Sequence, residues 1–126
     1  MIVNYRNNKA WQKADELVME IYDATRSFPQ EELYGLTSQI RRAGISVAAN
    51  IAEGTGRNTE KDYLRFLYQA RGSLTEVEYY IHLSAKLGYL SNGHLDMLRE
   101  TRDEAGRVLQ GLIKHIESKI RISPSN

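Results

Sequence analysis

The segment from Leu36 to Tyr89 reads LTSQIRRAGISVAANIAEGTGRNTEKDYLRFLYQARGSLTEVEYYIHLSAKLGY. It contains two helical patterns of apolar residues, interrupted only at Gly54-Thr55-Gly56. Residues 43–52 of the first pattern carry no charge and have mostly small side chains, which let helix backbones approach closely. We therefore expect the rest of the chain to pack around this run.

Apolar residues also recur at three- and four-residue steps on both sides of this segment. Before it, the pattern predicts a helix that ends at Phe28-Pro29, because the residue before a proline is pushed out of the helical region. After it, the residues from Leu95 to Ile120 predict a last helix. The four predicted helices span roughly residues 9–28, 37–54, 59–87 and 92–121, with flexible ends at 1–8 and 122–126. This pattern is typical of a single all-α domain over residues 1–126, an antiparallel up-down-up-down four-helix bundle.

Polar residues and glycines mark the predicted helix boundaries. Thr37 is the expected N-cap of the second helix, and Asn58 or Thr59 that of the third. Gly54-Thr55-Gly56-Arg57 is expected to end the second helix through a glycine C-cap, and Gly88 to end the third.

Glycine and serine inside the predicted helices indicate close packing. Gly44 costs roughly 1 kcal/mol relative to alanine in a helix interior. Close contact with a neighbouring helix is the expected compensation. Gly72 and Ser73 predict the same kind of contact for the third helix.

The second and third helices carry more apolar surface than one bundle needs. Beside the face of Ile40, Gly44, Val47 and Ile51, the second helix has another apolar strip, and the third has tyrosines outside its core stripe. A second copy of the chain is the expected cover. The candidate interface residues are Ile45, Ala48, Ala52, Tyr68 and Tyr79.

Composition excludes several kinds of protein. The 126 residues include 17 basic and 16 acidic side chains, for a net charge of +1, and no cysteine, so neither a disulfide nor a thiolate metal site can form. The first residues show no signal peptide, and the longest uncharged run, residues 43–52, is about half the length of a membrane span. We expect a soluble, cytoplasmic protein without a membrane partner.

Signals for catalysis are weak. The three histidines include His82, four residues after Glu78, whereas a di-iron bundle uses paired Glu-x-x-His motifs at a three-residue step. A surface pair of Glu78 with His82 is the favoured interpretation. The glycines at 54 and 56 lack the Gly-Lys-Ser/Thr ending of a phosphate loop. The sequence predicts no cofactor, no metal and no enzyme.

Basic residues gather in the middle of the chain. Arg57, Lys61 and Arg65 follow one another at four-residue steps and form a possible ridge for phosphate contacts. For a single chain, a solvated face with pairs to Glu53, Glu60 and Asp62 is the favoured alternative. In an oligomer, several copies of a weak patch would act together. The candidate nucleic-acid-binding residues are Arg41, Arg42, Arg57, Lys61 and Arg65.

A separate set of polar residues lies close to the small-residue faces, where a buried charge must be paired. We expect Glu53 or Glu76 to meet Arg42 or Arg71, within a chain or between copies. A network that fixes helix register or the subunit interface is favoured over a ligand site. The candidate network residues are Gln39, Ser46, Asn50, Glu53, Arg71 and Glu76.

Between Trp11 and Leu90, a series of short motifs occurs in the same order as in a known family. They include Trp11-Gln12-Lys13-Ala14, Ile21-Tyr22, Phe28-Pro29, Leu36 to Ala43, Ser46, Asn50 to Gly54, Tyr63, Phe66-Leu67, Ala70, Gly72-Ser73 and Glu76. The chain resembles the small bacterial four-helix-bundle proteins encoded in intervening sequences of large-subunit ribosomal RNA genes. That family is similar to the accessory variability-determinant proteins of diversity-generating retroelements.

The resemblance implies a helical bundle that assembles into a ring, as a homopentamer, with RNA or DNA as a partner. Members of the intervening-sequence group mostly lack an assigned activity, whereas the retroelement relatives bind a reverse transcriptase and RNA through a basic surface. We therefore expect a non-enzymatic, nucleic-acid-associated accessory protein. The alternative is a structural or protein-binding module with no nucleic-acid role.

Overall fold

Four α-helices make up most of residues 4–122, the part of the chain that the computed structural model describes. They are α1 (Lys9–Thr25), α2 (Leu36–Thr55), α3 (Glu60–Lys86) and α4 (Asn92–Ile122). Two short 3₁₀ helices, η1 (Tyr5–Asn7) and η2 (Gln30–Glu32), precede α1 and α2. The described residues contain no strand, so the prediction of an all-α protein with four helices is confirmed.

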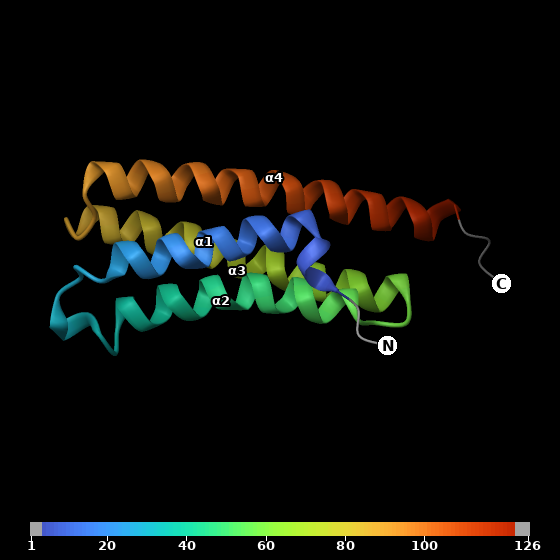
Figure 1. Ribbon diagram of the computed structural model, residues 1–126, viewed down its shortest axis with the longest axis horizontal. Coiled ribbons are helices and arrows are strands. Elements are labelled where there is room, and N and C mark those ends of the chain that lie inside the picture. Colours follow the sequence, from blue (N-terminus) through green and yellow to red (C-terminus); the bar gives the residue numbers. More distant parts are fainter. Residues whose placement is uncertain (1–3, 123–126) are drawn as a thin grey trace.

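The helices lie side by side, and the chain reverses direction at each connection (Figure 1). α2 packs between α1 and α3, while α4 covers the other sides of α1 and α3. The backbones of α1 and α3 are not adjacent, and neither are those of α2 and α4, so these two pairs face each other diagonally across the core. The α2–α3 turn and the end of α4 therefore share one end of the molecule, on the right in Figure 1.

The core consists of the apolar stripe of each helix. Its fully buried side chains include Ile21, Ile40, Leu67, Leu109 and Ile113. Burial of each such side chain contributes about 1.5–3 kcal/mol. The periodicity that predicted the helices thus also selects the residues that meet in the centre.

Two glycines permit close approach of neighbouring helices. A Cβ at Gly44 would lie 2.7 Å from Ile21 Cδ1, which confirms the expected close contact, here with α1. A Cβ at Gly54 would lie 2.8 Å from a ring atom of Tyr63 and 3.1 Å from Phe66 Cβ, both on α3. The prediction for Gly72 is wrong: it is exposed, and nothing lies within 4 Å of an added Cβ.

Several helix boundaries differ from the expected ones. α1 ends at Thr25, before Phe28, and the connection forms η2. Thr37 does not cap α2, because the N-cap is Gly35 and the carboxylate of Glu32 accepts the Leu36 N–H at 3.1 Å.

A glycine ends α2 as expected, since Gly56 is its C-cap, but this glycine is not in the left-handed conformation. Its φ is −90°. Thr59 caps α3 as expected, since its hydroxyl accepts the Asp62 N–H at 3.1 Å. Gly88 follows Leu87, the C-cap of α3, and ends that helix as expected. Its φ is +78°, the left-handed conformation that glycine adopts most easily.

The start of the chain is more ordered than expected. The side chain of Asn8 accepts the Trp11 N–H at 3.1 Å and caps α1, and its amide donates to the Tyr63 hydroxyl at 3.1 Å. The Tyr5 ring packs edge-on against Trp11 at 5.0 Å between centroids. Residues 4–8 are therefore held against the bundle rather than frayed. The remaining parts of the predicted flexible ends, residues 1–3 and 123–126, lie outside the described residues.

Across residues 4–122, the length and hydropathy of the helices leave none able to cross a membrane.

Candidate nucleic-acid interface

The turn between α2 and α3 carries two arginines on one aromatic ring. The guanidinium carbons of Arg57 and Arg65 lie 4.5 Å and 4.4 Å from the centroid of Phe66. Cation–π contact with the ring holds both side chains near the start of α3. Phe66 is itself buried, and this role of its ring was not anticipated from the sequence.

Carboxylates partly neutralise this pair of arginines. Arg57 lies 3.2 Å from Glu53 and 3.6 Å from Asp62, and Arg65 lies 2.8 Å from Asp62. These are two of the three acids that the sequence offered as local partners. Lys61 is exposed and has no ion pair among residues 4–122.

Arg41 and Arg42 do not join this group. They lie on α2, about 15 residues before Arg57, and this separation corresponds to about 22 Å along a helix axis. Arg41 lies over the Tyr22 ring at 4.5 Å, whereas Arg42 is exposed. The five candidate residues therefore form two separate groups rather than one surface.

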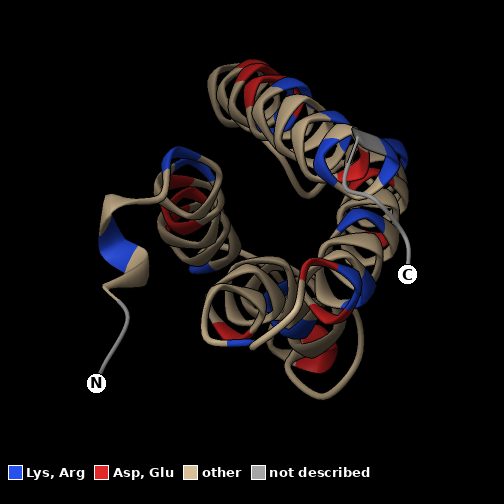
Figure 2. Cartoon of the chain, turned by 90° about the vertical axis from the view of Figure 1, so that its right-hand side faces the viewer, with Lys and Arg blue, Asp and Glu red and all other residues tan. Residues whose placement is uncertain are grey.

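The fold instead brings the start of α3 beside the end of α4. The Tyr68 hydroxyl donates to Glu117 at 2.5 Å, and Arg71 donates to Gln110 at 3.2 Å. Residues 53–71 and 104–121 together contain eight basic and five acidic side chains, while the rest of the chain contains nine and eleven. We call these two segments the basic end of the bundle, which faces the viewer in Figure 2.

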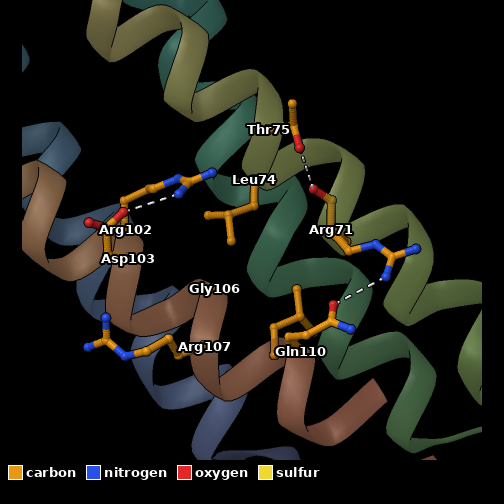
Figure 3. Close-up of a pocket in the computed structure, with 9 residues that line it drawn as sticks. Arg71, Leu74, Thr75, Arg102, Asp103, Gly106, Arg107 and Gln110 are labelled. Atoms are coloured by element: carbon orange, nitrogen blue, oxygen red, sulfur yellow. Dashed lines mark hydrogen bonds and ion pairs between the residues drawn. The ribbon is translucent and has the colours of Figure 1, made fainter. Parts of the chain in front are cut away.

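A hollow of about 460 Å³ lies between α3 and α4, next to the basic end (Figure 3). Leu74, Leu109 and Gly106 form its apolar part, while Arg71 and Arg102 reach across it from opposite helices. Sequence reasoning did not predict this hollow.

Arg102 is the charged residue within the apolar stripe of α4, which was the one signal for the hollow. Its Nε lies 3.6 Å from Glu78 and its Nη1 3.1 Å from Asp103. Glu78 therefore pairs with Arg102 rather than with His82, so the predicted Glu78–His82 pair is wrong.

The predicted polar network is only partly assembled. Ser46 and Ser73 join α2 to α3 through a hydrogen bond of 2.8 Å between their hydroxyls. The Asn50 amide donates to the Ser46 carbonyl at 2.9 Å and to its hydroxyl at 3.1 Å. A groove of about 330 Å³ beside these residues is lined by Gln39, Arg42, Ala43, Ser46, Glu76 and Tyr80.

The expected ion pair of Glu53 or Glu76 with Arg42 or Arg71 is not formed within the chain. Glu53 pairs with Arg57, and Arg71 donates to Gln110 on α4. Glu53 and Arg71 therefore lie outside the α2–α3 groove. The side chains of Arg42 and Arg71 are exposed, so neither requires an acidic partner to offset burial of its charge.

The candidate interface residues differ in their accessibility. Ile45 and Tyr79 are 44% and 56% exposed, which is unusual for large apolar side chains. Tyr68 is also exposed, with its hydroxyl bound to Glu117, and Ala52 is half-buried. Ala48 is buried within its own bundle and presents almost no surface to a second copy.

Two ionisable groups near the α1–α4 contact have shifted pKa values. Hydrogen bonding to Lys13 lowers the pKa of Glu104, with the ion pair at 2.8 Å. Partial burial raises the pKa of Glu20, although the Thr101 hydroxyl donates to its Oε2 at 2.8 Å. Glu20 Oε1 is buried without a hydrogen-bond partner. Within residues 4–122, no group of three or more His, Asp or Glu side chains could hold a metal ion.

The fold and these surfaces define a small all-helical protein whose polar features are surface arginines and shallow grooves. The chain belongs to the 23S rRNA-intervening sequence protein family, whose model matches residues 6–111. A solved structure from Bacteroides thetaiotaomicron, a protein with unknown function from the S23 ribosomal protein family, is similar in fold, with a TM-score of 0.76. It is 23% identical, and the match covers 83% of this chain and 98% of that one. A search of curated proteins found no match.

Proposed function

We propose that this chain is a non-enzymatic accessory protein that binds RNA in the cytoplasm as a ring-shaped homopentamer. In this proposal the basic end contacts RNA phosphates, and the outer surfaces of α2 and α3 contact neighbouring copies. The family name, which refers to a 23S rRNA intervening sequence, is consistent with RNA as the partner.

The observation that carries the proposal is the uneven charge along the bundle. The basic end has an excess of three positive charges, while the remainder has an excess of two negative charges. Electrostatic attraction to phosphates depends on such a local excess rather than on the net charge. Lys61 and Arg65 lie within this excess and are exposed.

Assembly would raise the affinity of a weak patch. Each copy offers only a few cations, but several copies on one RNA convert later contacts into intramolecular ones. The exposed side chains of Ile45 and Tyr79 supply apolar surface for such assembly. A pentamer would have five times the chain mass of 14.4 kDa, which light scattering measures directly.

The proposal is tested by RNA binding at several salt concentrations. The double variant Lys61→Gln/Arg65→Gln should bind single-stranded RNA more weakly, and the slope of log K against log salt should fall by about 1.4, since each phosphate contact contributes about 0.7. The matched control is Lys86→Gln/Arg99→Gln, two exposed cations at the opposite end. It should retain the affinity and slope of the original protein. Equal losses in both variants, or no binding by the intact oligomer at low salt, would contradict the proposal.

A second candidate function is a protein-binding module. Large apolar side chains are exposed near the end opposite the basic one, where Tyr34 is 92%, Leu87 48% and Met97 51% exposed. The Tyr89 hydroxyl donates to Glu32 at 2.9 Å, so the α1–α2 and α3–α4 connections meet there. Such a module would bind a specific protein, lose that binding in Tyr34→Ser, and show no salt-dependent RNA retention.

A further inference from the structure

A small pocket lies where α1 ends and α2 begins. Thr25 lines it at the end of α1 and Arg26 directly after that helix, and Thr37 and Arg41 line it from α2. The connection contributes Phe28, Pro29, Gln30 and Leu33. Its volume is about 120 Å³, about that of four water molecules in the liquid. Two arginines and no carboxylate line it.

The side chain of Arg41 is held in place at this pocket. Its Nε donates to the Thr25 hydroxyl at 2.9 Å, and its guanidinium lies over the Tyr22 ring at 4.5 Å. The Thr25 hydroxyl in turn donates to the Ile21 carbonyl at 2.7 Å, which directs its lone pairs toward Arg41. No carboxylate of residues 4–122 lies within 4.0 Å of Arg41, so its two Nη groups keep their hydrogens for another acceptor.

Thr37 supplies an unused hydroxyl. The residue is 3% exposed, and its Oγ1 is buried without a hydrogen-bond partner. A buried hydroxyl in this state costs free energy, and a ligand oxygen in the pocket would satisfy it. Thr37 also lies in the first turn of α2, where the helix dipole favours negative charge.

Two carboxylates near this pocket, Glu32 and Asp23, have partners of their own, and the exposed Glu31 does not line it. Glu32 accepts from the Leu36 N–H at 3.1 Å and from the Tyr89 hydroxyl at 2.9 Å, and it does not line the pocket. Asp23 lies 3.3 Å from His94. Its contact with Arg26 is longer, at 3.8 Å, and the Arg26 side chain is 76% exposed. Arg26 is therefore free to turn over the opening.

We propose that this pocket binds a single phosphate group. The Arg41 Nη groups and the Thr37 hydroxyl donate to its oxygens from two sides, and Arg26 covers it. An arginine fork suits a phosphate, because two parallel N–H donors match two of its oxygens. The volume admits one such group and excludes a nucleoside, so the remainder of a phosphomonoester would lie outside. This site is at the opposite end of the bundle from the basic end and does not depend on the proposed function (Figure 1).

The test is calorimetric titration of the full chain with sodium phosphate, against sodium chloride at equal ionic strength. We expect saturable binding of one phosphate per chain. Arg41→Gln should weaken it about tenfold or more, because a charge-assisted bidentate contact is lost. Thr37→Val keeps the shape of the side chain and should weaken phosphate binding about threefold or more without lowering the melting temperature of the free protein. Arg42→Gln is the matched control: Arg42 is the next residue, is exposed and does not line the pocket, so its loss should leave phosphate affinity unchanged.

Absence of saturable phosphate binding would overturn the proposal and would mean that water alone fills the pocket. A loss of phosphate affinity in Arg42→Gln equal to that in Arg41→Gln would also overturn it. If Arg41→Gln fails to fold, an unchanged phosphate affinity in Thr37→Val would overturn it. A 5′-phosphorylated trinucleotide and its 5′-hydroxyl form distinguish the sources of the phosphate. Preference for the phosphorylated form assigns a nucleic-acid end, and binding of inorganic phosphate without that preference assigns the free ion. The Lys61→Gln/Arg65→Gln variant should bind phosphate normally, so the two proposals fail separately.

Discussion

At the level of single residues, the buried polar atoms without hydrogen-bond partners are informative. Glu20 Oε1, Thr37 Oγ1 and Arg102 Nε are buried without hydrogen-bond partners. Thr37 lines the proposed phosphate pocket, and Arg102 lines the α3–α4 hollow. Glu20 lies against α4 through Thr101, so its burial affects stability.

Glu20→Gln should stabilise the protein by about 0.5 kcal/mol at pH 7, within the usual range for partly exposed sites. Its pKa is raised by burial, so ionisation is harder in the folded state than in the unfolded chain. Above the folded pKa the charge costs stability, and below the unfolded pKa, where both states are protonated, the cost is absent. Urea unfolding should thus show a higher free energy of unfolding for Glu20→Gln than for the original protein at pH 7. This difference should disappear as the pH falls below the folded and then the unfolded pKa of Glu20. A gain of the same size at every pH would contradict this explanation.

At the scale of helices, the α2–α3 contact depends on the absence of side chains at particular positions. Gly54 lets Tyr63 and Phe66 of α3 approach α2, and Ser46 bonds Ser73 between the same helices. The Phe66 ring in turn contacts the guanidinium groups of Arg57 and Arg65. Helix packing and the position of the basic end are therefore linked.

Gly54→Ala and Gly72→Ala should have opposite effects. An added methyl at Gly54 meets α3 at 2.8 Å and should destabilise the protein by about 1–3 kcal/mol, as in other overpacked cores. At Gly72 the methyl meets nothing, so the higher helix propensity of alanine should stabilise by about 0.5–1 kcal/mol. Melting temperatures of the two variants, measured side by side, check both signs. Stabilisation by Gly54→Ala would show that the α2–α3 contact tolerates more volume than the structure indicates.

At the level of the whole molecule, the bundle has two distinct ends and a few exposed apolar side chains between them. The basic end and the end that exposes Tyr34, Leu87 and Met97 are opposite each other. Ile45 and Tyr79 are exposed within α2 and α3, between these ends. This arrangement allows side-by-side assembly that leaves both ends accessible.

Ile45→Glu should dissociate the proposed oligomer without unfolding the chain. Ile45 is already 44% exposed in one copy, so a charge there costs little until a neighbour covers it. Met19→Glu, at a residue 64% exposed on α1, is the matched control and should leave the oligomer intact. Light scattering gives the mass, and circular dichroism checks that both variants are folded. An unchanged mass for Ile45→Glu would rule out the proposed interface.

The helices and their core could be predicted from the sequence, because apolar residues at three- and four-residue steps leave few other ways to bury them. The sequence also indicated close packing at Gly44, the Thr59 cap and the stop at Gly88. Caps and turns were less predictable: Thr37 resembles an N-cap, but Glu32 took that role through a contact from the preceding turn.

The grouping of charged residues became apparent only in the folded chain. Arg57 and Arg65 share one ring, Arg41 is held by Thr25, and Arg71 meets Gln110 across helices. Helical periodicity fixes the face on which a residue lies but not the residue opposite it on another helix. That pairing depends on the register and crossing of helices distant in sequence, which close contacts at glycines such as Gly44 and Gly54 set.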